Sequence, residues 1–524
     1  MIRRYPVGVQ DFEKIRKDGY LYVDKTALIY RLVNEGSYYF INRPRRFGKS
    51  LFISTLAAYF EGKRELFDGL AIADLEKDWP SHPVLRFDFS TGKYENAEIL
   101  REDIDFKLSE YERQYNIEKV SEASNVRMQK LLKEIYRQTG RQIVILIDEY
   151  DSAMLYNAAN PEMQATVREM MRNLFAPIKE ADPMLRFVFF TGITKFSQMS
   201  VFSELNNLTN ISMLPQYDAL LGITQEEIET QMRPDIEMLA QRRGETPEET
   251  LRTLKAMYDG YHFSYEMTDI YNPFSLLKCL MTGEVESFWF ASATPTFLIR
   301  ILRELGGELP DIEGVIRNTT AFDTPIDGKI KDPIPVIFQS GYLTIKAAYK
   351  MPPYGQYRYM LGFPNQEVRT GFADSLINYV NNDNKESLGA ITNAYWDFYD
   401  DDDLTAFIEA LRTFFASFPY DINNQNEKHY QAVLYTLLVS FGADVRAEHH
   451  TNRGRIDIIL RMPKSIYVIE LKYDHPAREA RDQILSRGYA DALKDDPRPV
   501  RLVGICFSSK ERNITEWKIV NSKS

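Results

Sequence analysis

The amino-acid sequence predicts an α/β protein with more than one domain, and three patterns carry that prediction. Continuous apolar runs, such as those at 143–147 and 187–190, are separated by segments of helical periodicity, which is typical of a parallel sheet covered on both faces. A basic turn at 43–48 joins an aromatic strand to an apolar helix. The last hundred or so residues form an α-β-β-α-β pattern of their own.

Length and composition limit the class of protein. A chain of 524 residues is too long for one ordinary core, so two to four domains are expected. Its 44% hydrophobic and 27% charged residues are typical of a soluble globular protein. The formal net charge of -11 excludes a global positive field, so any contact with nucleic acid requires a local basic patch.

The same composition gives expectations about compartment and partners. Cys279 and Cys506 lie far apart and form no pair motif, which favours a reducing, cytoplasmic environment. The first twenty residues contain no long apolar run, so no signal peptide is expected. No apolar stretch approaches about 18 residues, so we expect no membrane partner. The six histidines are scattered, which disfavours a histidine-rich zinc site.

The elements can be assigned in order along the chain. Residues 1–215 read as the α/β domain, with strands expected at 37–44, 83–90, 141–148 and 185–191. The region 216–415 is mostly helical, and Thr224 and Thr246 are expected helix starts because acidic residues follow each of them. Within it, 330–370 predicts a helix, two strands around a Pro-Gly turn and another helix, as in a winged-helix segment. Residues 416–524 form the last domain.

The basic turn has the features of a phosphate-binding loop. Gly48, Lys49 and Ser50 supply the last turn, a point charge and a hydroxyl for Mg²⁺. The usual first glycine is replaced by Arg43, which is tolerable if this residue adopts an ordinary φ. Arg45 and Arg46 add positive charge near the phosphates. The alternative is a basic turn before a helix, because short motifs recur by chance.

A second group of residues favours the nucleotide interpretation. Asp148 and Glu149 follow a buried strand, and ligands bind at this edge of open α/β sheets. The aspartate can hold Mg²⁺ through water, and the glutamate can orient an attacking water. Thr191 and Thr194 follow the next strand and are candidates to contact the γ-phosphate or its water. The alternative is two solvated carboxylates at a strand end.

The C-terminal region carries a second candidate site. Asp457 lies in one expected strand, and Glu470 and Lys472 lie two residues apart on the next, on one face. Two carboxylates and a lysine suit Mg²⁺ or Mn²⁺ and a positioned water. Glu427, at the start of a helix, is a further candidate metal ligand. The alternatives are an ion pair along a strand and a helix-dipole acid.

Basic residues near this site are the candidates for DNA contact. They comprise Arg453, Arg455 and a helix from Arg478 through Arg481 to Arg487, which also carries Gln483 and Tyr489. Such side chains can meet phosphates. A solvated helix face is an equally good interpretation of this helix.

Two sets of motifs resemble known families. "YPVGVQDFEKI", "YLYVDKT", "INRPRRFGKSLF", "LIDEYD" and "TGITKFS" resemble the AAA-ATPase-like family of bacterial proteins, and "GRIDIIL" with "IELK" resembles the PD-(D/E)XK nuclease superfamily. The resemblance implies a P-loop NTPase parallel sheet, a helical or winged-helix region and a C-terminal restriction-endonuclease-like α/β domain. Lys49, Ser50, Asp148 and Glu149 match the nucleotide motifs, and Asp457, Glu470 and Lys472 match the nuclease triad.

We therefore expect an ATP-binding and ATP-hydrolysing protein coupled to a Mg²⁺-dependent DNA phosphodiesterase. One alternative is a signalling or scaffold protein, in which nucleotide acts as a conformational switch and the tail only binds a partner or nucleic acid. Another is an accessory ATPase of a mobile element, which leaves the tail unexplained.

Overall fold

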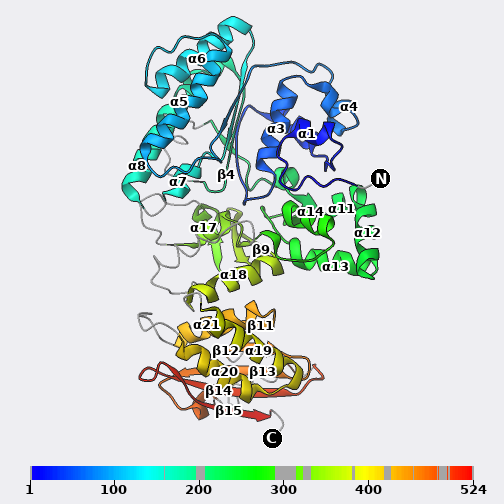
Figure 1. The fold of residues 1–524 in the computed structure, drawn as a ribbon, viewed down its shortest axis with the longest axis vertical. Helices are drawn as coiled ribbons and strands as arrows, with labels where there is room; N and C mark the ends of the chain where they lie inside the picture. Colours follow the sequence, from blue (N-terminus) through cyan, green and yellow to red (C-terminus); the bar gives the residue numbers. More distant parts are fainter. Residues whose placement is uncertain are drawn as a thin grey trace. The chain divides into compact units, whose positions relative to one another are not determined.

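The structure is a computed structural model that describes most of the chain. The described residues are 3–157, 160–195, 207–289, 314–322, 332–380, 384–417, 427–451, 454–480, 482, 493 and 496–521. They form two compact units (Figure 1). Described residues up to Gln366 belong to the first unit, and those from Glu367 onward belong to the second.

A parallel five-stranded sheet forms the centre of the first unit. Its strand order is β2-β3-β4-β1-β5, and every neighbouring pair is parallel. The strands are β1 (Tyr38–Asn42), β2 (Val84–Asp88), β3 (Ile143–Asp148), β4 (Leu185–Gly192) and β5 (Thr209–Asn210). The predicted parallel sheet is confirmed. The two-residue β5 has too short an apolar pattern to be predicted.

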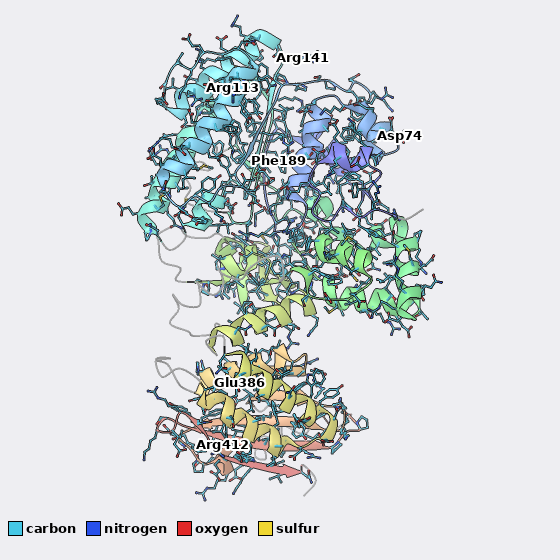
Figure 2. All side chains as sticks on the ribbon, in the orientation of Figure 1. Asp74, Arg113, Arg141, Phe189, Glu386 and Arg412 are labelled. Atoms are coloured by element: carbon cyan, nitrogen blue, oxygen red, sulfur yellow. The ribbon has the colours of Figure 1, made fainter. Side chains whose placement is uncertain are left out.

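Helices cover both faces of this sheet, which explains the continuous apolar runs. On β3, Ile143, Ile145 and Ile147 pack into one hydrophobic core, whereas Val144 and Leu146 pack into another. Phe189 of β4 lies in the second core (Figure 2). Figure 1 shows α1, α3 and α4 on one side of β4 and α5, α6 and α8 on the other.

The helices of the two layers have the following bounds. One layer contains α1 (Phe12–Lys17), α2 (Thr26–Glu35), α3 (Lys49–Phe60), η1 (Arg64–Phe67) and α4 (Ala71–Leu75). The other contains α5 (Ala97–Gln114), α6 (Ser124–Thr139), α7 (Ser152–Tyr156), α8 (Pro161–Phe175), α9 (Pro177–Glu180) and η2 (Asp182–Met184).

The rest of the first unit combines a helical cluster with two small sheets. Thr224 and Thr246 each form a capping box, which confirms the helix starts expected there. The helices are η3 (Pro215–Leu220), α11 (Gln225–Gln231), α12 (Arg233–Arg243), α13 (Pro247–Tyr258), α14 (Pro273–Thr282), η4 (Thr319–Phe322) and α17 (Ile334–Gln339). The strands are β6 (Ile223–Thr224), β7 (Ile270–Tyr271), β8 (Ile316–Asn318), β9 (Thr344–Met351) and β10 (Gln356–Gly362). The sequence α17-β9-β10-α18 is the order of elements expected for 330–370.

The second unit is a mixed five-stranded sheet with helices. The helices are α18 (Gln366–Val380), α19 (Lys385–Asp401), α20 (Leu404–Ala416) and α21 (Glu427–Ser440). The strands are β11 (Asp444–Thr451), β12 (Gly454–Arg461), β13 (Ile466–Tyr473), β14 (Val500–Ser508) and β15 (Asn513–Asn521), in that spatial order. Only β13 and β14 pair in parallel. Helices α19, α20 and α21 share one hydrophobic core with this sheet.

The C-terminal sheet has more strands than the α-β-β-α-β pattern predicts. The additional strands β11 and β15 form its two edges. Both alternate apolar with polar or charged residues, as in "DVRAEHHT", so neither has the continuous apolar run of a central strand.

No helix in the described parts of the chain is long and apolar enough to cross a membrane.

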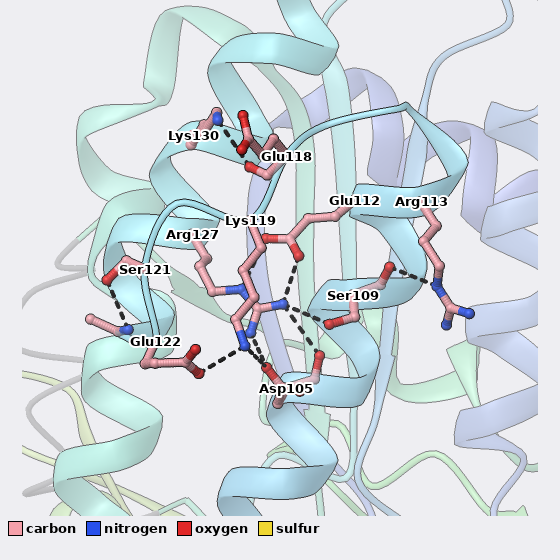
Figure 3. Close-up of polar contacts among 11 residues, drawn as sticks. Asp105, Ser109, Glu112, Arg113, Glu118, Lys119, Ser121, Glu122, Arg127 and Lys130 are labelled. Atoms are coloured by element: carbon pink, nitrogen blue, oxygen red, sulfur yellow. Dashed lines mark hydrogen bonds and ion pairs between the residues drawn. The ribbon is translucent and has the colours of Figure 1, made fainter.

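A buried ion cluster joins α5 to α6 (Figure 3). Arg127 is 2% exposed, and its Nε and Nη2 donate to the two carboxylate oxygens of Glu112 at 2.9 and 2.7 Å. Nη2 also donates to the Ser109 hydroxyl at 2.8 Å, and Nη1 pairs with the Asp105 carboxylate. The positive charge of the guanidinium therefore balances the negative charge of the Glu112 carboxylate, which is itself buried.

We expect Arg127→Ala to lower the free energy of unfolding of the first unit by about 3 kcal/mol, because Glu112 would stay buried without its counter-charge. The matched control is Arg137→Ala on the same helix. This side chain is 71% exposed and pairs with Glu134 in solvent, so its removal should leave the free energy of unfolding nearly unchanged. Guanidinium denaturation of the full chain measures both. Equal effects of the two substitutions would contradict a stabilising role for the cluster.

Candidate functional site

The basic turn lies between β1 and α3, as the sequence predicts. Gly48 has φ 88° and ψ 19°, in the left-handed region that favours glycine, and it is the N-cap of α3. The free backbone N–H groups and the positive end of the helix dipole therefore lie at the end of this turn. This combination attracts phosphate groups.

Lys49 is held inside the turn. Its side chain is buried, with 4% exposure, and its Nζ donates to the carbonyl oxygens of Arg43 and Pro44, both at 3.0 Å. Burial lowers the pKa of this ammonium, whereas the nearby Glu149 and Asp148 carboxylates oppose that shift. The turn thus positions a poorly solvated cation at the start of α3.

The Arg43 side chain is buried at the start of the turn and stabilises its backbone. Arg43 is absent from the residues with positive φ, so the glycine that it replaces is not required for the backbone here. The side chain is 1% exposed and stacks on Phe263 with 3.8 Å between guanidinium carbon and ring centre. Nη1 donates to the carbonyl oxygens of Asn42 at 3.0 Å and Ser212 at 2.8 Å. Burial lowers the pKa of Arg43 to about 10.

A cavity of about 250 Å³ opens beside the turn. Its polar lining comes from the turn and from the end of β3, namely Arg45, Arg46, Gly48, Lys49, Ser50 and Glu149. Its other walls are the segment from Pro6 to Gln10 and three residues of α14: Pro273, Phe274 and Leu277. Arg46 lies over the Phe274 ring at 4.9 Å. The cavity therefore joins a cationic end to a largely apolar end.

The two carboxylates at the end of β3 have different environments. Asp148 is 3% exposed and accepts a hydrogen bond from the Thr191 hydroxyl. Glu149 lines the cavity and has φ 49°, which is rare for a side chain of this kind. Burial raises the pKa of Glu149, and Lys49 opposes the shift. The strained backbone turns one carboxylate into the cavity, while its neighbour stays beneath it.

The two candidate threonines lie beneath the cavity and are fully buried. Thr191 donates to Asp148, and the Thr194 hydroxyl donates to Asp151 Oδ2 at 2.8 Å. Neither threonine, nor Asp148, is among the residues that line the cavity. In this structure the threonines thus support the carboxylates instead of facing a phosphate.

Asp151 is a site residue that the sequence does not single out. It is 0% exposed, and its Oδ2 also accepts from the backbone N–H groups of Ile193 at 3.0 Å and Thr194 at 2.6 Å. It therefore ties the chain after β4 to the chain after β3. The sequence contains Asp151 as the third carboxylate of "LIDEYD", but the segment that it contacts lies more than forty residues later in the chain.

The second unit brings the four C-terminal candidates together. Asp457 on β12 accepts from the backbone N–H of Leu471 at 2.8 Å. Lys472 Nζ lies 3.4 Å from Glu470 Oε1 and 4.0 Å from Glu427 Oε1. Glu470 is 1% exposed, and Glu427 is the first residue of α21. Hence one lysine connects a buried carboxylate with a half-buried one.

These side chains fit a hard divalent cation by their chemistry. Carboxylate oxygens are preferred by Mg²⁺, which often uses one or two of them and keeps several waters. Within the described ranges, no group of three or more His, Cys, Asp or Glu side chains is already arranged around a metal position. Asp457 and Glu470 can therefore supply part of a coordination shell that water and phosphate oxygens complete.

Most of the basic residues expected to contact DNA cannot be placed. Arg453, Arg481, Gln483, Arg487 and Tyr489 lie outside the described residues, as does the Arg455 side chain. Arg478 is described and exposed.

The fold and the two sites define the class of protein. A parallel sheet with a phosphate-binding turn between β1 and α3 is an α/β P-loop domain, and the mixed C-terminal sheet with its acidic pair is nuclease-like. Residues 6–202 match the model of the predicted AAA-ATPase family, and residues 425–517 match that of the PD-(D/E)XK nuclease superfamily. The chain belongs to the family of AAA-ATPase-like proteins with a C-terminal domain of this nuclease superfamily.

One relative aligns with nearly the whole of this chain. It is the "Uncharacterized protein in vnfD 5'region" of Azotobacter chroococcum mcd 1, which is 34% identical over 527 residues and is covered to 99%, as is this chain. No solved structure matches the chain significantly.

Proposed function

We propose that the first unit binds ATP with Mg²⁺ and hydrolyses it slowly, and that the second unit cleaves DNA with Mg²⁺ or Mn²⁺. The observation that carries the nucleotide assignment is the cavity that joins Lys49 and Ser50 to an apolar wall. Cationic and helix N-terminal groups suit phosphates, and the wall formed by Val7, Val9 and Phe274 suits a planar base.

The residues of the first unit divide the chemical work. Lys49 would exchange its two carbonyl acceptors for phosphate oxygens, with Arg45 and Arg46 adding positive charge. Ser50 and Asp148 would hold Mg²⁺, which neutralises charge on the phosphates. Glu149 faces the cavity and would orient the attacking water and accept its proton. Asp151 and the two threonines would keep these carboxylates in place.

We expect Glu149→Gln to bind ATP as tightly as the unchanged protein but to hydrolyse it at least about 100-fold more slowly, because the amide cannot accept a proton. Isothermal titration measures binding, and phosphate release measures turnover. Glu169→Gln, an exposed glutamate on α8, is the matched control and should leave both unchanged. Unchanged turnover in Glu149→Gln would remove this residue from the mechanism.

The rate of hydrolysis should also depend on pH through this side chain. Glu149 acts as a base only when it is deprotonated, and burial raises its pKa above that of an ordinary carboxyl. The rate of ATP hydrolysis should therefore decline on acidification, and the midpoint of this decline should lie at a higher pH than for an exposed glutamate base.

In the second unit, Asp457 and Glu470 would hold the metal, and Lys472 would position or deprotonate the attacking water. Glu427 is a further candidate metal ligand, close to the same lysine.

The second candidate function is a nucleotide-switched signalling or scaffold protein whose tail only binds a partner or nucleic acid. The ion pairs of Lys472 with Glu470 and Glu427 are what a structural cluster would also show, whereas the intact set of Asp457, Glu470 and Lys472 argues against a purely structural tail. Cleavage that disappears with a chelator separates the two candidates.

A further inference from the structure

The small sheet β8-β10-β9 exposes several large apolar side chains. The exposed fractions are 50% for Ile316, 46% for Tyr349 and 37% for Met351. Tyr354, in the turn between β9 and β10, is 90% exposed. A group of exposed apolar side chains of this kind on one element marks an interaction surface more often than a free one.

The strand register places Ile316, Tyr349 and Met351 on one outer face, and Ile316 joins it because its partner Met360 lies two residues from Arg358. Tyr354 lies in the turn that joins β9 to β10. Arg358 of β10 pairs with Tyr349 of β9 and with Asn318 of β8, and cross-strand partners share a face. Met351 pairs with Gln356 on this same face, since it lies two residues from Tyr349. We call the group Ile316, Tyr349, Met351, Tyr354 and Arg358 the aromatic face.

The opposite face of the sheet is already covered within the first unit. Tyr357 stacks on Tyr265 with ring centres 4.5 Å apart and planes 2° apart. Tyr359 is buried and packs against Phe322 at 5.6 Å. The aromatic face is thus not needed to attach the sheet to the rest of the unit.

The charge of this sheet is opposite to that of the whole chain. The segments 314–318 and 344–362 contain Arg317, Lys346, Lys350 and Arg358 and no acidic residue, although the chain has a net charge of -11. Arg317 pairs with Asp332 at 3.4 Å. Arg358, on the aromatic face, has no acidic side chain within 4.0 Å among the described residues, so it can meet an external anion.

We propose that the aromatic face binds single-stranded DNA. Tyrosine rings stack on unpaired bases, whereas the bases of a duplex are already stacked on each other. Arg358 lies opposite Tyr349 on this face and would contact the phosphates, whereas Lys350 pairs with Tyr357 and lies on the other face. An acidic peptide would use the Arg358 cation but not the rings. The proposal rests on the proposed function only for the choice of DNA over RNA.

The test is fluorescence anisotropy of a labelled oligo(dT) of about 20 nucleotides with the full chain, in chelator and without nucleotide. Tyr349→Ala and Tyr354→Ala should each weaken binding about fivefold or more. The substitution Arg358→Glu should reduce the slope of log affinity against log salt by about 0.7, which corresponds to one lost phosphate contact. Tyr136→Ala and Lys133→Glu, both exposed on α6, are the matched controls and should change neither quantity.

Neither hydrolysis nor cleavage is needed for this measurement, so a failed nuclease or ATPase assignment leaves it intact. Circular dichroism and thermal unfolding of each variant show that the first unit is folded. Unchanged binding of oligo(dT) by the variant that combines the Tyr349, Tyr354 and Arg358 substitutions would overturn the proposal. Equal losses of affinity for duplex DNA and for oligo(dT), or tighter binding of oligo(U) than of oligo(dT), would also overturn it. A variant whose oligomeric state changes while its DNA affinity does not would show that the face is a protein interface.

Discussion

Lys49→Ala should weaken ATP binding at least about 100-fold and thereby abolish hydrolysis. Hydrogen bonds from a charged donor contribute about 1.5–3 kcal/mol each, and the ammonium group can make two of them to phosphate oxygens. Each of these hydrogen bonds should be stronger than in water, because Lys49 is buried and poorly solvated before the ligand binds. Its present acceptors, the carbonyl oxygens of Arg43 and Pro44, belong to the turn itself and would be replaced by the ligand.

Isothermal titration with ATP and Mg²⁺ measures this loss. Lys49→Ala also leaves two carbonyl groups without their donor, so Lys49→Gln, which can still donate to them, is a second variant that tests charge alone. The matched control is Lys133→Ala, an exposed lysine on α6, which should bind ATP normally. Equal ATP affinity in the unchanged protein and both Lys49 variants would exclude this turn as the phosphate site.

Local patterns explain why much of the nucleotide site can be predicted from the sequence. Gly48, Lys49 and Ser50 are consecutive, and their role follows from the strand before them and the helix after them. Glu149 is equally local, because it directly follows the buried strand β3. In each case the backbone element that positions the residue is adjacent to it in the sequence.

Contacts between distant segments could not be predicted in the same way. Thr194 follows a strand end, as a phosphate-contacting residue would, but its hydroxyl donates to Asp151, more than forty residues earlier. The apolar wall of the cavity comes from the segment at Val7 and from Phe274, which no local pattern connects. The edge strands β11 and β15 are not predicted because more than half of the residues in each strand are polar or charged.

The second large effect is expected in the C-terminal unit. Asp457→Asn and Lys472→Ala should each reduce Mg²⁺-dependent DNA cleavage at least about 100-fold, since the first removes a charged metal ligand and the second the group that positions water. Both residues contact the same short segment: Asp457 accepts from Leu471 N–H, and Lys472 donates to the Leu471 carbonyl. The asparagine can accept the same hydrogen bond, so a loss of activity would reflect charge rather than folding.

The assay uses linear, nicked and single-stranded DNA with Mg²⁺, Mn²⁺ or chelator, each with and without ATP. Lys510→Ala, an exposed lysine after β14, is the matched control and should cleave normally. Cleavage that persists in Asp457→Asn, or in chelator, would show that the metal site is elsewhere. Absence of cleavage by the folded, unchanged protein on every substrate would favour the binding-module alternative. The cluster of Glu427, Glu470 and Lys472 would then be a structural ion group, and Lys472→Ala would lower stability because it removes the cation that lies 3.4 Å from the buried Glu470 carboxylate.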